Sequence, residues 1–118
     1  MLRIMIVLAD VLGQTVLAAA CSCARLTVEE LIEDPRDLAV FSARVVSILS
    51  PEKGKPAVTR LQAGEVIKGE VPRVIDMTGV TAADNPCGVD FRPGEVRTIA
   101  AYKKDGRWFT DMCLIPRL

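Results

Sequence analysis

Histidine is absent from all 118 residues of the chain. Without it, the sequence cannot form the serine–histidine or cysteine–histidine pairs of nucleophilic catalysis, nor a histidine-ligated metal site. Glycines stand singly near expected turns, which excludes a glycine-rich phosphate loop. The carboxylates Glu29, Glu30 and Glu33 fall on one short polar segment and are interpreted as solvated side chains. We therefore expect a protein that is not an enzyme and that needs no cofactor.

A net charge is also missing, because 15 basic residues balance 15 acidic ones. Nucleic acids and anionic membrane surfaces attract proteins that carry a clustered basic excess. Aromatic residues are scarce, and most of the five are needed for a core: Phe41, Phe91, Tyr102, Trp108 and Phe109. The sequence therefore offers no aromatic platform on which bases could stack, and nucleic-acid binding is not expected.

Long apolar runs are rare, and the one that matters lies within residues 1–20. This segment has a basic start at Arg3, an apolar middle and small residues up to Ala20, the pattern of a signal peptide cleaved after Ala20. Asp10 divides its apolar part, which is then too short for a retained membrane anchor. We expect residues 1–20 to be a signal peptide, Cys21 to begin the mature chain, and the protein to be secreted, either extracellular or periplasmic.

Two other interpretations of this leader stay open. Residues 1–20 could instead form a buried N-terminal helix. Small residues before Cys21 also fit a bacterial lipoprotein box, although Ala18 stands where leucine is preferred, and Cys21 would then carry a lipid anchor. No other segment is long and apolar enough to predict a membrane span.

Four cysteines occur in the sequence: Cys21, Cys23, Cys87 and Cys113. In a small exported chain they predict two disulfides, with three conceivable pairings. A Cys21–Cys23 bond would close a strained ring, and the spacing does not choose between the two long-range schemes. The C-x-C spacing with two isolated cysteines differs from the paired C-x-x-C knuckles of zinc sites, so zinc binding and thiol redox chemistry rank below disulfides. Each long-range bridge would contribute about 4 kcal/mol to stability.

Local signals predict one short helix followed by five strands. Thr27 and Glu30 have the spacing of a capping box, and Asp34-Pro35 ends the helix about two turns later. The expected strands, each rich in β-branched or apolar residues, are 38–49, 58–67, 73–80, 95–103 and 107–114. Gly64 is expected to bend the second strand, and Asp105-Gly106 to turn the last hairpin. The predicted fold class is mostly β, a small antiparallel barrel in a single domain, 21–118.

The order of these motifs resembles the N-terminal domain of the tissue inhibitors of metalloproteinases, within the netrin-like family. The most specific element is the Cys21-Ser22-Cys23 start of the mature chain. The further elements, in order, are a short helix, the strand 40–46, and the segments 66–70, 87–91, 96–102, 105–106 and Cys113. The resemblance covers most of residues 21–114.

This resemblance implies a five-stranded barrel of the oligonucleotide/oligosaccharide-binding (OB) type with two disulfides, Cys21–Cys87 and Cys23–Cys113. It also implies that the α-amine and carbonyl oxygen of Cys21 chelate the catalytic zinc of a protease, while the Ser22 side chain enters the specificity pocket. We expect a monomeric, non-enzymatic binding domain whose protein partner is a zinc metalloprotease. The alternative is a secreted or lipid-anchored structural or adhesion module with no protease target.

Overall fold

The computed structural model of the protein describes residues 21–117. The expected signal peptide, residues 1–20, lies outside the described residues. The elements are one short helix, five strands and a final 3₁₀ turn: α2 Val28–Glu33, β1 Ala39–Leu49, β2 Val58–Lys68, β3 Val74–Thr78, β4 Val96–Lys104, β5 Arg107–Phe109 and η1 Met112–Leu114.

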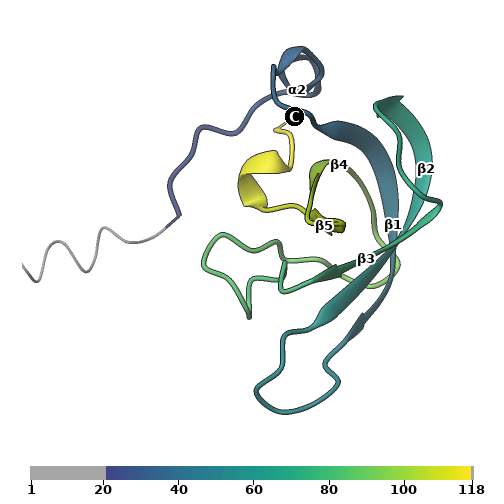
Figure 1. The fold of residues 1–118 in the computed structure, drawn as a ribbon. Helices are drawn as coiled ribbons and strands as arrows, with labels where there is room; N and C mark the ends of the chain where they lie inside the picture. The colour runs from purple at the N-terminus through teal and green to yellow at the C-terminus, as the bar shows by residue number, and fades with distance from the viewer. Residues whose placement is uncertain (1–20, 118) are drawn as a thin grey trace, which may run out of the picture.

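The five strands form one antiparallel sheet in the order β3-β2-β1-β4-β5. The sheet curls so far that its two outer strands, β3 and β5, contact each other without pairing as a ladder. Figure 1 shows the resulting curled half-barrel, with α2 near one end and the last turn of the chain inside the curve. The mostly β, five-stranded fold with one short helix is therefore confirmed.

Strand β1 is the middle strand of the sheet, and both of its faces are buried near its start. Phe41 and Val45 point into the main core, where they pack with residues of β2, β3 and β4. Val40 points the other way, into a second cluster with Leu31 of α2 and Leu114 of η1. Strands buried on both faces have nearly continuous apolar sequences, which explains the run at the start of β1.

Gly64 lies in the predicted irregularity of β2. Between the pairs Phe41–Val66 and Ala43–Ala63 the register gains one residue on β2, which defines a β-bulge. A Cβ atom at Gly64 would lie 2.7 Å from the Ser42 hydroxyl oxygen, and that oxygen accepts a hydrogen bond from the Glu65 backbone N–H at 2.9 Å. The expectation of a bend at Gly64 is confirmed.

The predicted helix cap and the predicted hairpin turn are also present in the structure. Thr27 and Glu30 exchange both hydrogen bonds of the capping box, and α2 ends before Asp34. Asp105 and Gly106 both adopt positive φ angles, 52° and 77°, as a tight two-residue hairpin turn requires.

The prediction of a strand over 107–114 is wrong beyond Phe109. The chain leaves the ladder at Thr110, whose hydroxyl donates to the carbonyl oxygen of Ala100 at 2.8 Å. Asp111 then accepts a hydrogen bond from the Cys113 backbone N–H at 2.8 Å and caps η1. A local side chain–backbone bond of this kind competes with a strand ladder, and here it replaces the ladder.

Candidate functional site

Cys21 and Cys23 each form a disulfide with a distant part of the chain. Cys21 is bonded to Cys87, with 5.1 Å between their Cα atoms, and Cys23 is bonded to Cys113, with 5.9 Å between theirs. This confirms the pairing implied by the resemblance, which the spacing alone had left open. We call the region that these bonds join the disulfide edge: residues 21–26, 81–94 and 110–117.

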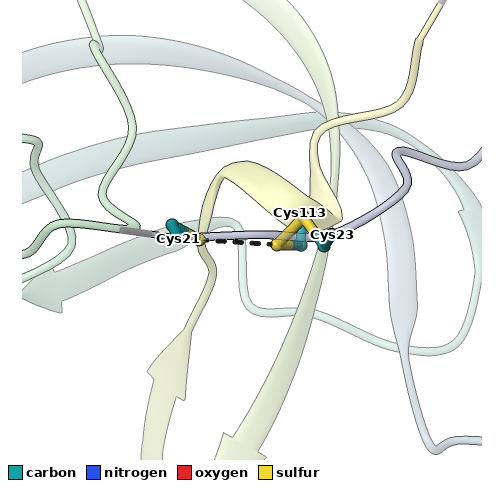
Figure 2. A group of neighbouring side chains, drawn as sticks. All are labelled: Cys21, Cys23 and Cys113. Carbon is teal, nitrogen blue, oxygen red and sulfur yellow. Dashed lines mark hydrogen bonds between the residues drawn. A yellow bond between two sulfur atoms is a disulfide. The ribbon is translucent and has the colours of Figure 1, made fainter. Parts of the chain in front are cut away.

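The two disulfides touch. The Sγ atoms of Cys21 and Cys113 lie 3.8 Å apart, and those of Cys21, Cys23 and Cys113 all lie within 4.8 Å of one another (Figure 2). Both atoms of the 3.8 Å pair belong to disulfides and carry no proton, so this is a van der Waals contact. Cys21 is half-buried, whereas Ser22 and Cys23 are exposed. The edge thus presents Ser22 on the surface between two cross-linked residues.

An Asx residue stands two positions before each distal cysteine. Asn85 Oδ1 accepts from the Cys87 backbone N–H at 2.9 Å, as Asp111 Oδ1 does from that of Cys113. The two local structures are joined directly, because the Met112 backbone N–H donates to the Cys87 carbonyl oxygen at 2.8 Å. Sequence reasoning missed both residues, and the signal that could have found them is the repeated Asx-x-Cys spacing.

The loop that carries Cys87 has a shape that only glycine allows at position 88. Thr81 and Val89 form an isolated parallel bridge, which brings Gly88 against the backbone. A Cβ atom at Gly88 would meet the Thr81 carbonyl oxygen at a distance no real contact allows. Asp84 Oδ2 accepts from the Ala57 backbone N–H at 2.9 Å and from the Thr81 hydroxyl at 3.1 Å, which ties the loop to the start of β2.

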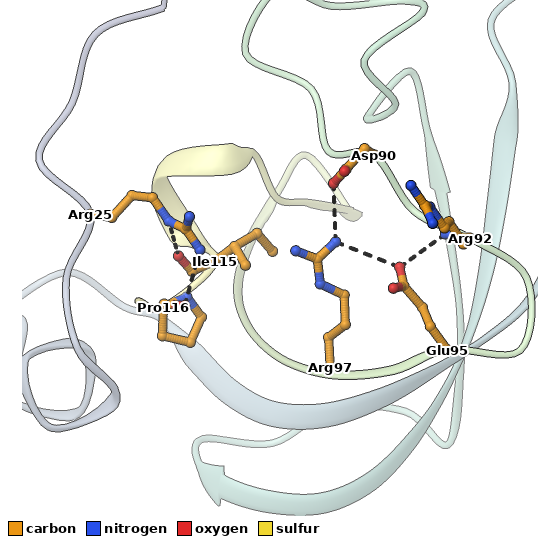
Figure 3. Close-up of polar contacts among 7 residues, drawn as sticks. All are labelled: Arg25, Asp90, Arg92, Glu95, Arg97, Ile115 and Pro116. Atoms are coloured by element: carbon orange, nitrogen blue, oxygen red, sulfur yellow. Dashed lines mark hydrogen bonds and ion pairs between the residues drawn. The ribbon is translucent and has the colours of Figure 1, made fainter. Parts of the chain in front are cut away.

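The segment after Cys23 is held by the end of the chain. Arg25 donates through its guanidinium to the carbonyl oxygens of Ile115 at 3.0 Å and Pro116 at 3.1 Å (Figure 3). In return, the Arg117 backbone N–H donates to the Leu26 carbonyl oxygen at 2.9 Å, and the Arg117 guanidinium donates to the Arg25 carbonyl oxygen at 3.2 Å. No local sequence pattern predicts these contacts, which join residues about 90 positions apart.

A cluster of charged side chains connects the loop that carries Cys87 to β4. Arg97 lies 3.2 Å from Asp90 and 3.5 Å from Glu95, and Glu95 also accepts from the Arg92 backbone N–H at 2.9 Å (Figure 3). The hydrogen bond from the Arg97 guanidinium holds the pKa of Asp90 below its usual value. Here the carboxylates of Asp90 and Glu95 serve as an ion-pair partner and a turn cap.

Ion pairs and caps also account for the other clear carboxyl shifts in residues 21–117. Hydrogen bonds from Arg36 lower the pKa of Asp34 to about 2, and the bond from Arg60 lowers that of Asp76. The Thr27 backbone N–H lowers the pKa of Glu30 within the capping box. Each of these pKa shifts favours the ionised carboxylate, because that form accepts the hydrogen bond. The shifts therefore have structural causes.

Comparison with protein-family models, with curated proteins and with solved structures finds no match to the chain. Within the described residues, no helix is long and apolar enough to cross a membrane. The candidate site is therefore argued from the geometry of residues 21–23 and their anchors.

Proposed function

We propose that the chain is an exported, non-enzymatic binding domain that inhibits a zinc metalloprotease through its mature N-terminus. In this proposal, cleavage after Ala20 frees the α-amine of Cys21, which coordinates the catalytic zinc of the protease together with the Cys21 carbonyl oxygen. The Ser22 side chain then enters the pocket beside that zinc. The observation that carries the proposal is the exposed Ser22 held between two disulfide-bonded cysteines.

Rigidity of residues 21–23 supports this role. The segment is bonded to the loop at Cys87 and to η1 at Cys113, and the next residue but one, Arg25, is held by two carbonyl oxygens. A segment ordered before binding loses less conformational entropy when it enters a protease cleft. The disulfides and the hydrogen bonds of Arg25 thus order the proposed inhibitory segment before it meets a protease.

The chemistry of an α-amine suits the proposed coordination. Its ordinary pKa is about 8, so a useful fraction is neutral at physiological pH and has a free lone pair. A catalytic zinc site keeps one position open for water or substrate, and a nitrogen ligand can occupy it. Coordination would displace the water that such an enzyme uses for hydrolysis.

The experiment compares chains that differ only at the N-terminus. The protein beginning at Cys21 and the same protein with Ala20 retained are titrated against a panel of zinc endopeptidases. We expect inhibition by the first form and at least about a hundredfold weaker inhibition by the second, a difference of about 2.7 kcal/mol. Acetylation of the Cys21 amine should have the same effect, because it removes the lone pair.

The controls separate chelation from other binding. Ser22→Gly keeps the amine but removes the side chain, so it should change the preference among proteases while inhibition persists. An intact mass with two disulfides in every form shows that no cross-link has been lost. Equal inhibition by the Cys21 and Ala20 forms would contradict chelation. No inhibition by either form would favour the structural or adhesion module.

A further inference from the structure

A thiol from solvent should open the two disulfides in a fixed order, because the four cysteine residues differ in exposure. Cys23 is exposed, whereas Cys21, Cys87 and Cys113 are half-buried. A thiolate from solvent attacks the disulfide sulfur that it can reach, and the partner sulfur leaves. Attack at Cys23 releases Cys113, whose Sγ lies 3.8 Å from Cys21 Sγ in the other disulfide (Figure 2).

We propose that Cys23 is a modification site for small thiols and that the attack is relayed to Cys87. In the first step, the thiolate of a low-molecular-weight thiol bonds to Cys23 Sγ, the Cys23–Cys113 bond breaks, and Cys113 leaves as a thiolate. In the second step, Cys113 Sγ attacks Cys21 Sγ, the Cys21–Cys87 bond breaks, and Cys87 leaves as a thiolate that takes a proton from water. The small thiol is the reductant: its sulfur is oxidised to the mixed disulfide while the Cys87 sulfur is reduced to a thiol, and no further oxidant or reductant is needed.

The product is a mixed disulfide at Cys23, a new Cys21–Cys113 bond and a free thiol at Cys87. The new bond spans 92 positions, compared with 66 for the bond it replaces. Because the entropy of loop closure depends on the logarithm of loop length, the second step, which replaces one intramolecular bond by another, changes the chain entropy little. The contact is already made in the native fold, so the second step needs little rearrangement before the sulfur atoms meet.

The test follows which cysteine becomes free when the oxidised protein meets glutathione at about 1 mM and about pH 8, near the ordinary thiol pKa. Samples are quenched with acid, labelled with N-ethylmaleimide and digested with trypsin. Cys87 and Cys113 then fall on different peptides, 74–97 and 108–117. We expect early label on Cys87, with peptide 108–117 linked to the peptide that ends at Arg25.

Fragmentation between Ser22 and Cys23 places the glutathione, which we expect on Cys23. Label on Cys113 with Cys21–Cys87 intact would show that the first bond opens without a relay. Glutathione on Cys21 would show direct attack on the other disulfide. Either result overturns the proposal.

A matched pair of variants measures the relay as a rate. Cys23→Ser with Cys113→Ser keeps only Cys21–Cys87, and Cys21→Ser with Cys87→Ser keeps only Cys23–Cys113. The relay begins with glutathione at the exposed Cys23, and its second step is intramolecular and therefore fast. In the first variant ~1 mM glutathione must attack the half-buried Cys21–Cys87 bond directly, so Cys87 should be released at least about tenfold more slowly than in the native chain. Equal rates would overturn the relay. If a variant does not fold, the position of glutathione in the native chain still decides, and no step of this test depends on protease inhibition.

Discussion

The sheet and the disulfide edge are held together by different physics. In the sheet, side chains such as Phe41, Val45 and Ile99 are almost completely buried, and backbone ladders connect every strand to its neighbour. At the edge, residues 21–25 contain no buried side chain, and their position is set by two disulfides and by hydrogen bonds from side chains to backbone. Burial therefore shapes the half-barrel, while covalent and capping bonds place the proposed inhibitory segment on it.

The largest effect should come from the core of the sheet. Phe41→Ala removes a fully buried ring and leaves a cavity, so we expect the free energy of unfolding to fall by about 4 kcal/mol. Urea unfolding should show a lower midpoint with an unchanged slope. Val46→Ala is the matched control on the same strand, because Val46 is 49% exposed and its loss should cost no more than about 0.5 kcal/mol. Equal losses from both variants would contradict the placement of the core.

Removal of one cross-link should have the next largest effect. Cys23→Ser with Cys113→Ser should lower the free energy of unfolding by about 3 kcal/mol, because a long loop is freed in the unfolded chain. The loss is smaller than for a lone bridge, since Cys21–Cys87 still restrains much of the same loop. Native-state hydrogen exchange should lose protection at the backbone amides of positions 113 and 114 and retain it where β1 pairs with β2. Loss of protection in both places would mean that the sheet depends on the edge.

The sheet could be predicted from sequence because its causes are local or periodic. Four of the five expected strands appear with small changes of boundary, since β-branched residues alternate with polar ones where one face is buried. Short motifs were sufficient to predict three local features: the capping box of Thr27 and Glu30, the bulge at Gly64 and the turn at Asp105-Gly106. Each of these features depends on residues close together in the chain or directly opposite in a ladder.

The edge could not be predicted in the same way because its partners are far apart. Cysteine spacing leaves two long-range pairings open, and only the family resemblance predicts the pairing that the structure shows. Arg25 meets Ile115 across 90 positions, and nothing local to either residue indicates that contact. The sequence pattern predicts a strand through Asp111, although the Asp111 side chain caps η1. Alternating apolar residues carry no information about such capping bonds.

The two Asx caps should contribute less than a disulfide. Asn85→Ala removes the oxygen that accepts from the Cys87 backbone N–H, and we expect a loss of about 1 kcal/mol in urea unfolding. Asn85→Asp keeps the acceptor and is the matched control, so it should lose much less. The same comparison at Asp111 uses Asp111→Ala and Asp111→Asn. If the conservative variants lose as much as the alanine variants, the caps do not hold the two distal cysteines.

The smallest effect should be the pH dependence of the ion pair that joins the edge to the sheet. The pKa of Asp90 lies below its ordinary 3.8 in the folded protein because Arg97 donates a hydrogen bond to its carboxylate. A lowered folded pKa means that the unfolded state binds the proton more readily, so the pair stabilises the fold above about pH 4 and this contribution is lost as pH falls through the folded pKa. The Asp90 side chain is 78% exposed, so we expect a contribution of no more than about 0.5 kcal/mol, reduced further by salt.

Carboxyl NMR titration of the native chain and of Arg97→Gln measures the pKa of Asp90 with and without its ion-pair partner. The variant should bring the pKa of Asp90 up towards 3.8 and flatten the fall in unfolding free energy as the pH drops below about 4. An Asp90 that already titrates at 3.8 in the native chain would mean that its ion pair with Arg97 contributes nothing to the connection between the loop and β4.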